Sequence, residues 1–88
     1  MNIYEPVFAG KIDSEDRPEV PVVVYKNLST ELYHMRIDGG DLLDLGEGAT
    51  VETSIDTDRE IMRIRIQSDC WTGTAHGTKW DFMQAASL

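Results

Sequence analysis

Polar and apolar residues alternate most clearly in two neighbouring segments in the second half of the chain. In residues 49–56 every second residue is apolar or threonine. In residues 61–67, Met62, Ile64 and Ile66 alternate with mostly polar residues. A period of two is typical of a strand with one buried face. Only a few polar residues separate the two segments, so the pattern predicts a β-hairpin. In that hairpin Arg63 and Arg65 share the outer face with Glu52.

Three earlier segments also predict strands. Residues 20–25 form a β-branched apolar run, and Pro21 favours a place at a sheet edge or at a strand start. Residues 31–37 alternate between apolar and polar side chains, as a half-buried strand does. Residues 3–12 predict a strand that Pro6 interrupts, followed by a polar, exposed loop.

The end of the chain allows two interpretations. Glycines and threonines from Gly73 to Thr78 indicate a turn, and residues 79–86 fit either a final strand or a short helix. Together these segments predict a single domain over residues 1–88. The expected fold is mainly β, a small antiparallel sandwich or barrel of five to six short strands, with or without a short C-terminal helix. An α+β fold is the alternative.

The chain is acidic, and one segment carries almost all of its net negative charge. Sixteen acids against eight bases give a net charge of -8. Between residues 38 and 60, eight acids minus Arg59 leave -7, and the rest of the chain contributes -1. The acids of this segment are Asp38, Asp41, Asp44, Glu47, Glu52, Asp56, Asp58 and Glu60. They form either a solvated face that maintains solubility or a surface for a basic partner.

The expected compartment is the cytoplasm. The N-terminus lacks the basic and apolar regions of a secretion signal, and no apolar run approaches the roughly 20 residues that span a bilayer. Cys70 is the only cysteine, which excludes an internal disulfide and fits a reducing compartment. We therefore expect no membrane association.

Calcium binding is the first chemistry to test, because Asp56, Asp58 and Glu60 alternate like the first ligands of an EF-hand loop. The sixth position of such a loop needs glycine and the twelfth needs glutamate. Here these positions hold Ile61 and Gln67, so the match fails.

Zinc and nucleophilic catalysis find no better support. Cys70, His34 and His76 show no familiar ligand spacing, and a lone cysteine is more often a small buried apolar group than a nucleophile. No phosphate loop or nucleophile elbow is present. We predict no catalytic residue, no metal and no cofactor, and therefore a protein that is not an enzyme.

Large aromatic side chains gather near the C-terminus. Trp71, Trp80 and Phe82 lie in the last fifth of the chain. Side chains of this size belong either to the core or to a partner interface, where tryptophan often anchors binding. Their role depends on whether the rings are exposed.

Two functions of different classes follow. The first is a small virus- or mobile-element-encoded inhibitor whose acidic surface occupies a basic, nucleic-acid-binding site on a host protein, for example in a nucleic-acid-processing complex. The partner-binding residues would be the eight acids above with Trp71 and Trp80. The second is a structural or assembly module, such as a virion component or an oligomeric subunit that adds its sheet edge to another chain.

Other partners are less well supported by the sequence. Direct nucleic-acid binding is disfavoured, since the net charge repels phosphates. A homo-oligomer is compatible with the sequence, because a chain this small buries a smaller fraction of its own surface than a larger one and gains stability when a second copy covers part of it. A sugar or small-ligand site at Trp71 and Trp80 is a third, weaker hypothesis.

Overall fold

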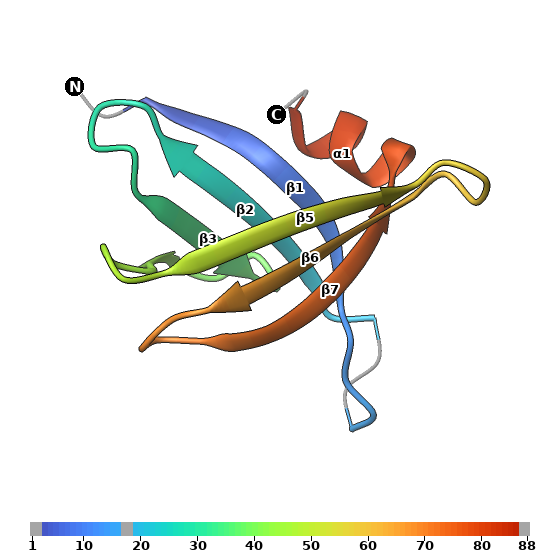
Figure 1. Cartoon of the computed structure of the whole chain (residues 1–88), viewed down its shortest axis with the longest axis horizontal. Coiled ribbons are helices and arrows are strands. Elements are labelled where there is room, and N and C mark those ends of the chain that lie inside the picture. Colours follow the sequence, from blue (N-terminus) through green and yellow to red (C-terminus); the bar gives the residue numbers. More distant parts are fainter. Residues whose placement is uncertain (1–2, 17–18, 87–88) are drawn as a thin grey trace.

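The structure is a computed structural model that describes residues 3–16 and 19–86. Within these residues the chain forms seven strands and one helix, namely β1 (Tyr4–Ile12), β2 (Pro21–Asn27), β3 (Tyr33–Ile37), β4 (Leu42–Asp44), β5 (Thr50–Asp56), β6 (Ile61–Gln67), β7 (Thr72–Thr78) and α1 (Lys79–Ala86). The strands form one antiparallel sheet in the order β4-β3-β2-β1-β7-β6-β5 (Figure 1). The sheet is open, and β4 and β5 are its two edges.

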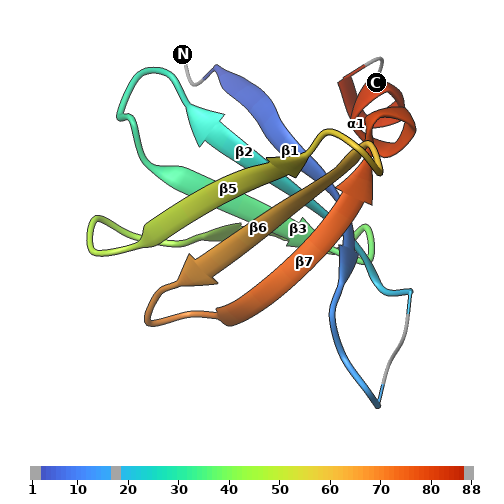
Figure 2. The ribbon, with the colours of Figure 1, turned by 45° about the vertical axis from the view of Figure 1, so that its right-hand side comes forward.

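The sheet bends so that its two halves enclose one core. Figures 1 and 2 show β5, β6 and β7 crossing over β1, β2 and β3. Both halves and the loop after β4 supply the buried apolar side chains, which are Phe8, Val22, Val24, Met35, Leu45, Ile64, Ile66 and Ala75. Burial of these side chains is the main stabilising contribution, at about 25 cal/mol per Å² of apolar surface.

Glycines permit the close crossing of β1 and β7, where the two halves of the sheet join. The ladder between these strands pairs only Lys11 with His76 and Ile12 with Ala75. A Cβ atom at Gly10 would overlap the carbonyl oxygen of His76, and one at Gly77 would overlap that of Ala9. Glycine inside a strand often marks such an approach of two backbones.

The C-terminal residues form a helix whose start is capped by side chains. The Thr78 hydroxyl accepts a hydrogen bond from the Asp81 N–H at 3.2 Å, and Asp81 Oδ2 accepts one from the Thr78 N–H at 2.9 Å. This reciprocal arrangement is a capping box. Helix α1 packs against β1 and β7. Among the residues described, no helix has the length and apolar character needed to cross a membrane.

The class predicted from the sequence, mainly β, is confirmed, and so is the hairpin, which is β5 and β6. Glu52 lies opposite Arg65, and Ser54 lies opposite Arg63. The predicted strand count of five to six is wrong, because the described chain has seven strands, and the sheet is open where a closed barrel or a sandwich was expected. The additional strands are β4, which has only three residues, and β7, whose glycines indicated a turn.

Candidate functional site

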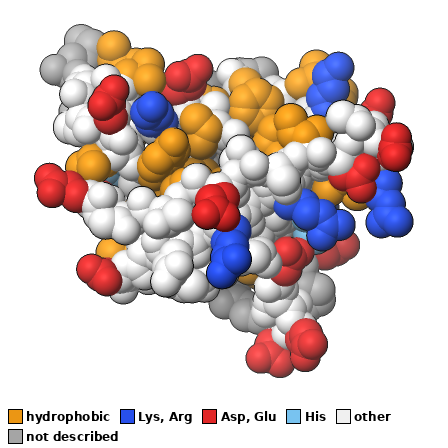
Figure 3. Space-filling view, in the orientation of Figure 1, with side chains coloured by type: hydrophobic (Ala, Val, Ile, Leu, Met, Phe, Trp, Pro, Cys, Tyr) orange, Lys and Arg blue, Asp and Glu red, His pale blue; other side chains and the backbone are white. Residues whose placement is uncertain are grey.

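The eight acids that are close in sequence lie in two groups in the structure. Asp38, Asp41, Asp44 and Glu47 are exposed on β4 and in the turns on either side of it. Asp56, Asp58 and Glu60 surround the β5–β6 turn, and Glu52 lies between the groups on the outer face of β5. Seven strand residues span roughly 23 Å. In the space-filling view the acidic side chains are scattered and form no single patch on this face (Figure 3).

The edge at β4 is short and charged. The strand has three residues and contains Asp44, and the turns on either side of it carry Asp38, Asp41 and Glu47. Short length and charge are two ways in which proteins prevent an edge strand from pairing with another chain. The β4 edge is therefore protected.

The edge at β5 has a different character. It is seven residues long, and within the described residues β6 is its only neighbour in the sheet. Its inner face carries Val51, Thr53 and Ile55, and 66% of Ile55 is exposed. An edge strand leaves backbone N–H and C=O groups without sheet partners, so β5 offers a template for another strand.

An apolar hollow of about 310 Å³ continues this surface where the β5–β6 hairpin meets α1. Its lining residues are Ile55, Thr57, Glu60, Ile61, Met62, Thr78, Lys79 and Phe82. Figure 3 shows hydrophobic surface in this region. We call strand β5 together with this hollow the β5 edge surface.

The aromatic group expected near the C-terminus is divided. Trp71 is half-buried and packs against the core, with its ring over Gly73. Trp80 on α1 is 65% exposed, and Met83 on the same helix is also exposed. Phe82 is half-buried and lines the hollow. The two tryptophans therefore do not share one environment.

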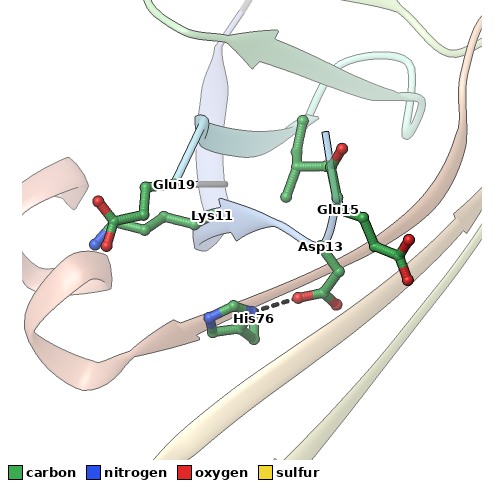
Figure 4. Close-up of a pocket in the computed structure, with 7 residues that line it drawn as sticks. Lys11, Asp13, Glu15, Glu19 and His76 are labelled. Carbon is green, nitrogen blue, oxygen red and sulfur yellow. Dashed lines mark hydrogen bonds and ion pairs between the residues drawn. The ribbon is translucent and has the colours of Figure 1, made fainter. Parts of the chain in front are cut away.

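A pair of polar side chains that the sequence did not indicate joins β7 to the segment after β1. His76 Nδ1 lies 2.5 Å from Asp13 Oδ1, and the Thr74 hydroxyl donates to Asp13 Oδ2 at 2.9 Å. Figure 4 shows the imidazole and the carboxylate pointing toward each other, with Lys11 and Glu19 on the other side of the ring. An open hollow of about 600 Å³ lies beside them. Local sequence gives no signal for this pair, because 63 positions separate its members.

The environment of Asp13 favours its ionised form. Burial alone would raise the pKa of this carboxyl. The hydrogen bonds with His76 and Thr74 and the charges of His76 and Arg63 outweigh that effect, so the pKa lies below its ordinary value of 3.8. Both side chains of the pair are about half exposed, at 42% for Asp13 and 50% for His76. The pair fixes the orientation of the imidazole and ties the two segments together.

Metal-ligating side chains do not converge in the part of the chain that the structure describes. No group of three or more His, Cys, Asp or Glu side chains there could hold an ion. The three residues considered for zinc, His34, Cys70 and His76, form no such group among the residues described.

Comparisons with models of known protein families, with curated protein sequences and with solved structures find no significant match to this chain. Function is therefore inferred from the geometry of this protein itself.

Proposed function

We propose that this protein is a non-catalytic protein-binding module that works in assembly, and that an extended segment of its partner adds to the sheet at the β5 edge surface. The contrast between the two edges supports this proposal. The β4 edge has three residues with one carboxylate in the strand and three beside it, whereas the β5 edge has seven residues and an exposed isoleucine. Such a difference favours pairing at β5 alone.

Strand addition at β5 satisfies two kinds of groups at once. The partner's backbone pairs with the N–H and C=O groups that β5 directs away from β6. Its apolar side chains cover Ile55 and extend toward the hollow at Phe82. Full burial of an isoleucine side chain is worth about 1.5 to 3 kcal/mol, so covering Ile55 contributes appreciably to binding.

The two faces of β5 define the chemistry of the partner segment. Its inner-face residues, Val51 and Ile55, match apolar side chains. Its outer-face acids, Glu52 and Asp56, match lysine or arginine, since opposite charges facing each other across two strands are stabilising. A peptide that alternates between aliphatic and basic residues therefore fits both faces best, and an uncharged polar residue opposite each acid is also compatible with pairing.

A defined peptide tests this function. We expect the capped peptide Val-Lys-Ile-Lys-Val-Lys-Ile to slow amide hydrogen exchange in residues 50–56 of the full chain, measured at a dilution at which the chain is monomeric and β5 is free. Ile55→Lys should abolish this protection by placing a charge on the apolar face. Leu43→Lys is the matched control, because Leu43 is a partly exposed aliphatic residue on the other edge strand and its replacement should have no effect. Absence of protection at β5, or equal loss in both variants, would contradict the proposal.

The acidic β4 edge supports a second candidate function, inhibition of a host protein by occupying its basic, nucleic-acid-binding site. Four exposed carboxylates on one short edge are the feature in its favour. Affinity for a purified nucleic-acid-binding protein should then fall steeply as salt rises. It should also fall when the group is neutralised as Asp38→Asn, Asp41→Asn, Asp44→Asn and Glu47→Gln. Unchanged affinity in this quadruple variant would eliminate the candidate.

A further inference from the structure

We infer that the strand that adds to β5 is β5 of a second copy, which gives a symmetric dimer with antiparallel pairing centred on Thr53. This inference rests on the proposed function and names its partner. A two-fold axis perpendicular to the sheet makes such an interface isologous, with the same strand contributed by each copy. The two open sheets then form one continuous sheet.

The sequence of β5 is complementary to itself in this register. Thr53 faces Thr53 of the second copy, Val51 faces Ile55, and Glu52 faces Ser54. Asp56 faces Thr50, so all seven residues of the strand are paired and no acid lies directly opposite another. Directly opposite side chains are the closest neighbours in an antiparallel pair, and like charges there are destabilising.

The neighbouring symmetric registers lack this complementarity. Centring the pair on Glu52 sets this acid against itself, and centring it on Ser54 sets Glu52 against Asp56. Centring on Val51 or Ile55 pairs only three residues of each strand, given the bounds of β5. Registers centred between two residues conflict with the axis, because opposite side chains would point to different faces of the sheet.

The inner face gains a continuous apolar row. Met62 lies opposite Ile55, and Ile66 lies opposite Val51, in the β5–β6 hairpin. In the dimer the row across four strands reads Met62, Ile55, then Val51 and Ile66 of the second copy. Val51 of the second copy then packs beside Ile55, a residue that is 66% exposed in the single chain.

The outer face gains a row in which no like charges are adjacent. Arg65 lies opposite Glu52, and Arg63 lies opposite Ser54, within each copy. Across the dimer the row reads Arg65, Glu52, then Ser54 and Arg63 of the second copy. A serine therefore separates each glutamate from the second copy's arginine, and both faces of β5 are compatible with pairing.

Single cysteines test the register directly. Cys70 is exposed and is first replaced by serine, so that the introduced thiol is the only one. Directly opposite residues have Cβ atoms roughly 4.5–5.5 Å apart, close to the roughly 3.5–4.5 Å of a disulfide. We expect Thr53→Cys to form a disulfide-linked dimer under mild oxidation. Glu52→Cys and Ser54→Cys are the matched controls and should react about tenfold more slowly, because each faces a different residue. Equal rates at the three positions, or fastest reaction at residue 52 or 54, would overturn the register.

Light scattering and sedimentation test the dimer itself. We expect the wild-type chain to dimerise, Ile55→Lys to weaken dimerisation by about tenfold or more, and Leu43→Lys to leave it unchanged. Circular dichroism checks that each variant is folded. A strict monomer up to millimolar concentration overturns the dimer. If that monomer still shows peptide-dependent protection of β5, the proposed function stands; without such protection, the proposed function fails as well.

Discussion

His76 Nδ1 lies 2.5 Å from Asp13 Oδ1 and thereby connects β7 to the segment that follows β1. The lowered pKa of Asp13 has a consequence for stability that depends on pH. A carboxyl that is more acidic in the folded state stabilises the fold above its ordinary pKa of 3.8, and this contribution is lost as the pH falls through the folded value. Wild-type stability should therefore decrease on acidification below about pH 4.

Replacement of either partner should reduce that acid dependence. In Asp13→Asn the carboxyl is absent, so the difference between the free energies of unfolding at about pH 5 and about pH 2.5 should shrink relative to wild type. His76→Ala should have the same direction of effect, and the double variant should add little, because the two side chains act through one interaction. Urea unfolding at the two pH values measures all four proteins. Fully additive effects of the two replacements would show that the pair is not coupled.

The glycines at the crossing of β1 and β7 should not tolerate a side chain. Gly77→Ala places a methyl group against the carbonyl oxygen of Ala9, and backbone atoms cannot move aside as a flexible side chain can. We expect a loss of about 2 to 4 kcal/mol in the free energy of unfolding, or failure to fold. Gly48→Ala is the matched control: open space surrounds this position, and its replacement should change stability by less than about 0.5 kcal/mol. Similar stability of the two variants would contradict the close crossing.

A comparison of the β5–β6 hairpin with strand β7 shows which parts of the fold the sequence could predict. The β5–β6 hairpin was predictable because its information is local: two alternating segments, a short turn, and arginines that share a face with Glu52. Strand β7 was not predictable, because Gly73 and Gly77 indicate a turn when only the local sequence is considered. The reason for glycine at these positions is visible only in the structure, where the Trp71 ring lies against Gly73 and the β1 backbone lies against Gly77.

The candidate site was predictable in its chemistry but not in its arrangement. The acidic segment from Asp38 to Glu60 is contiguous in sequence, yet β5 extends through it and separates its acids into two groups. The Asp13 and His76 side chains meet only because β7 inserts beside β1, a pairing that depends on the whole sheet order. The unprotected β5 edge likewise depends on which strands are outermost.

The capping box of α1 should contribute measurably to stability. Thr78→Ala removes the hydroxyl that accepts from the Asp81 N–H, and loss of an N-cap side chain costs about 1 kcal/mol. Thr78→Ser retains the hydroxyl and should retain most of the stability. Thermal unfolding, with the helical signal of circular dichroism, measures both. Equal loss in both variants would indicate that the methyl group of Thr78 matters and the cap does not.

Within residues 3–16 and 19–86, the Nε2 atom of His34 is the only buried side-chain nitrogen or oxygen that lacks a hydrogen-bond partner. The residue is 8% exposed, and its ring packs edge-on against Tyr4 with 5.1 Å between centroids. A buried polar atom without a partner costs about 1 to 3 kcal/mol. His34→Phe keeps a ring beside Tyr4 and removes that atom, so it should raise the free energy of unfolding by about 1 kcal/mol.

The matched variant His34→Ala separates the ring from its nitrogen. It also removes the unpartnered atom, but it leaves a space beside Tyr4, and the loss of packing should make it less stable than wild type by about 1 to 3 kcal/mol. Urea unfolding of the three proteins at neutral pH gives the comparison. We expect stability to decrease from His34→Phe to wild type to His34→Ala. Ring packing is retained in His34→Phe and in wild type, and of these two only wild type has the unpartnered nitrogen. If His34→Phe is as destabilising as His34→Ala, the imidazole nitrogens stabilise the fold and Nε2 has a partner in solution.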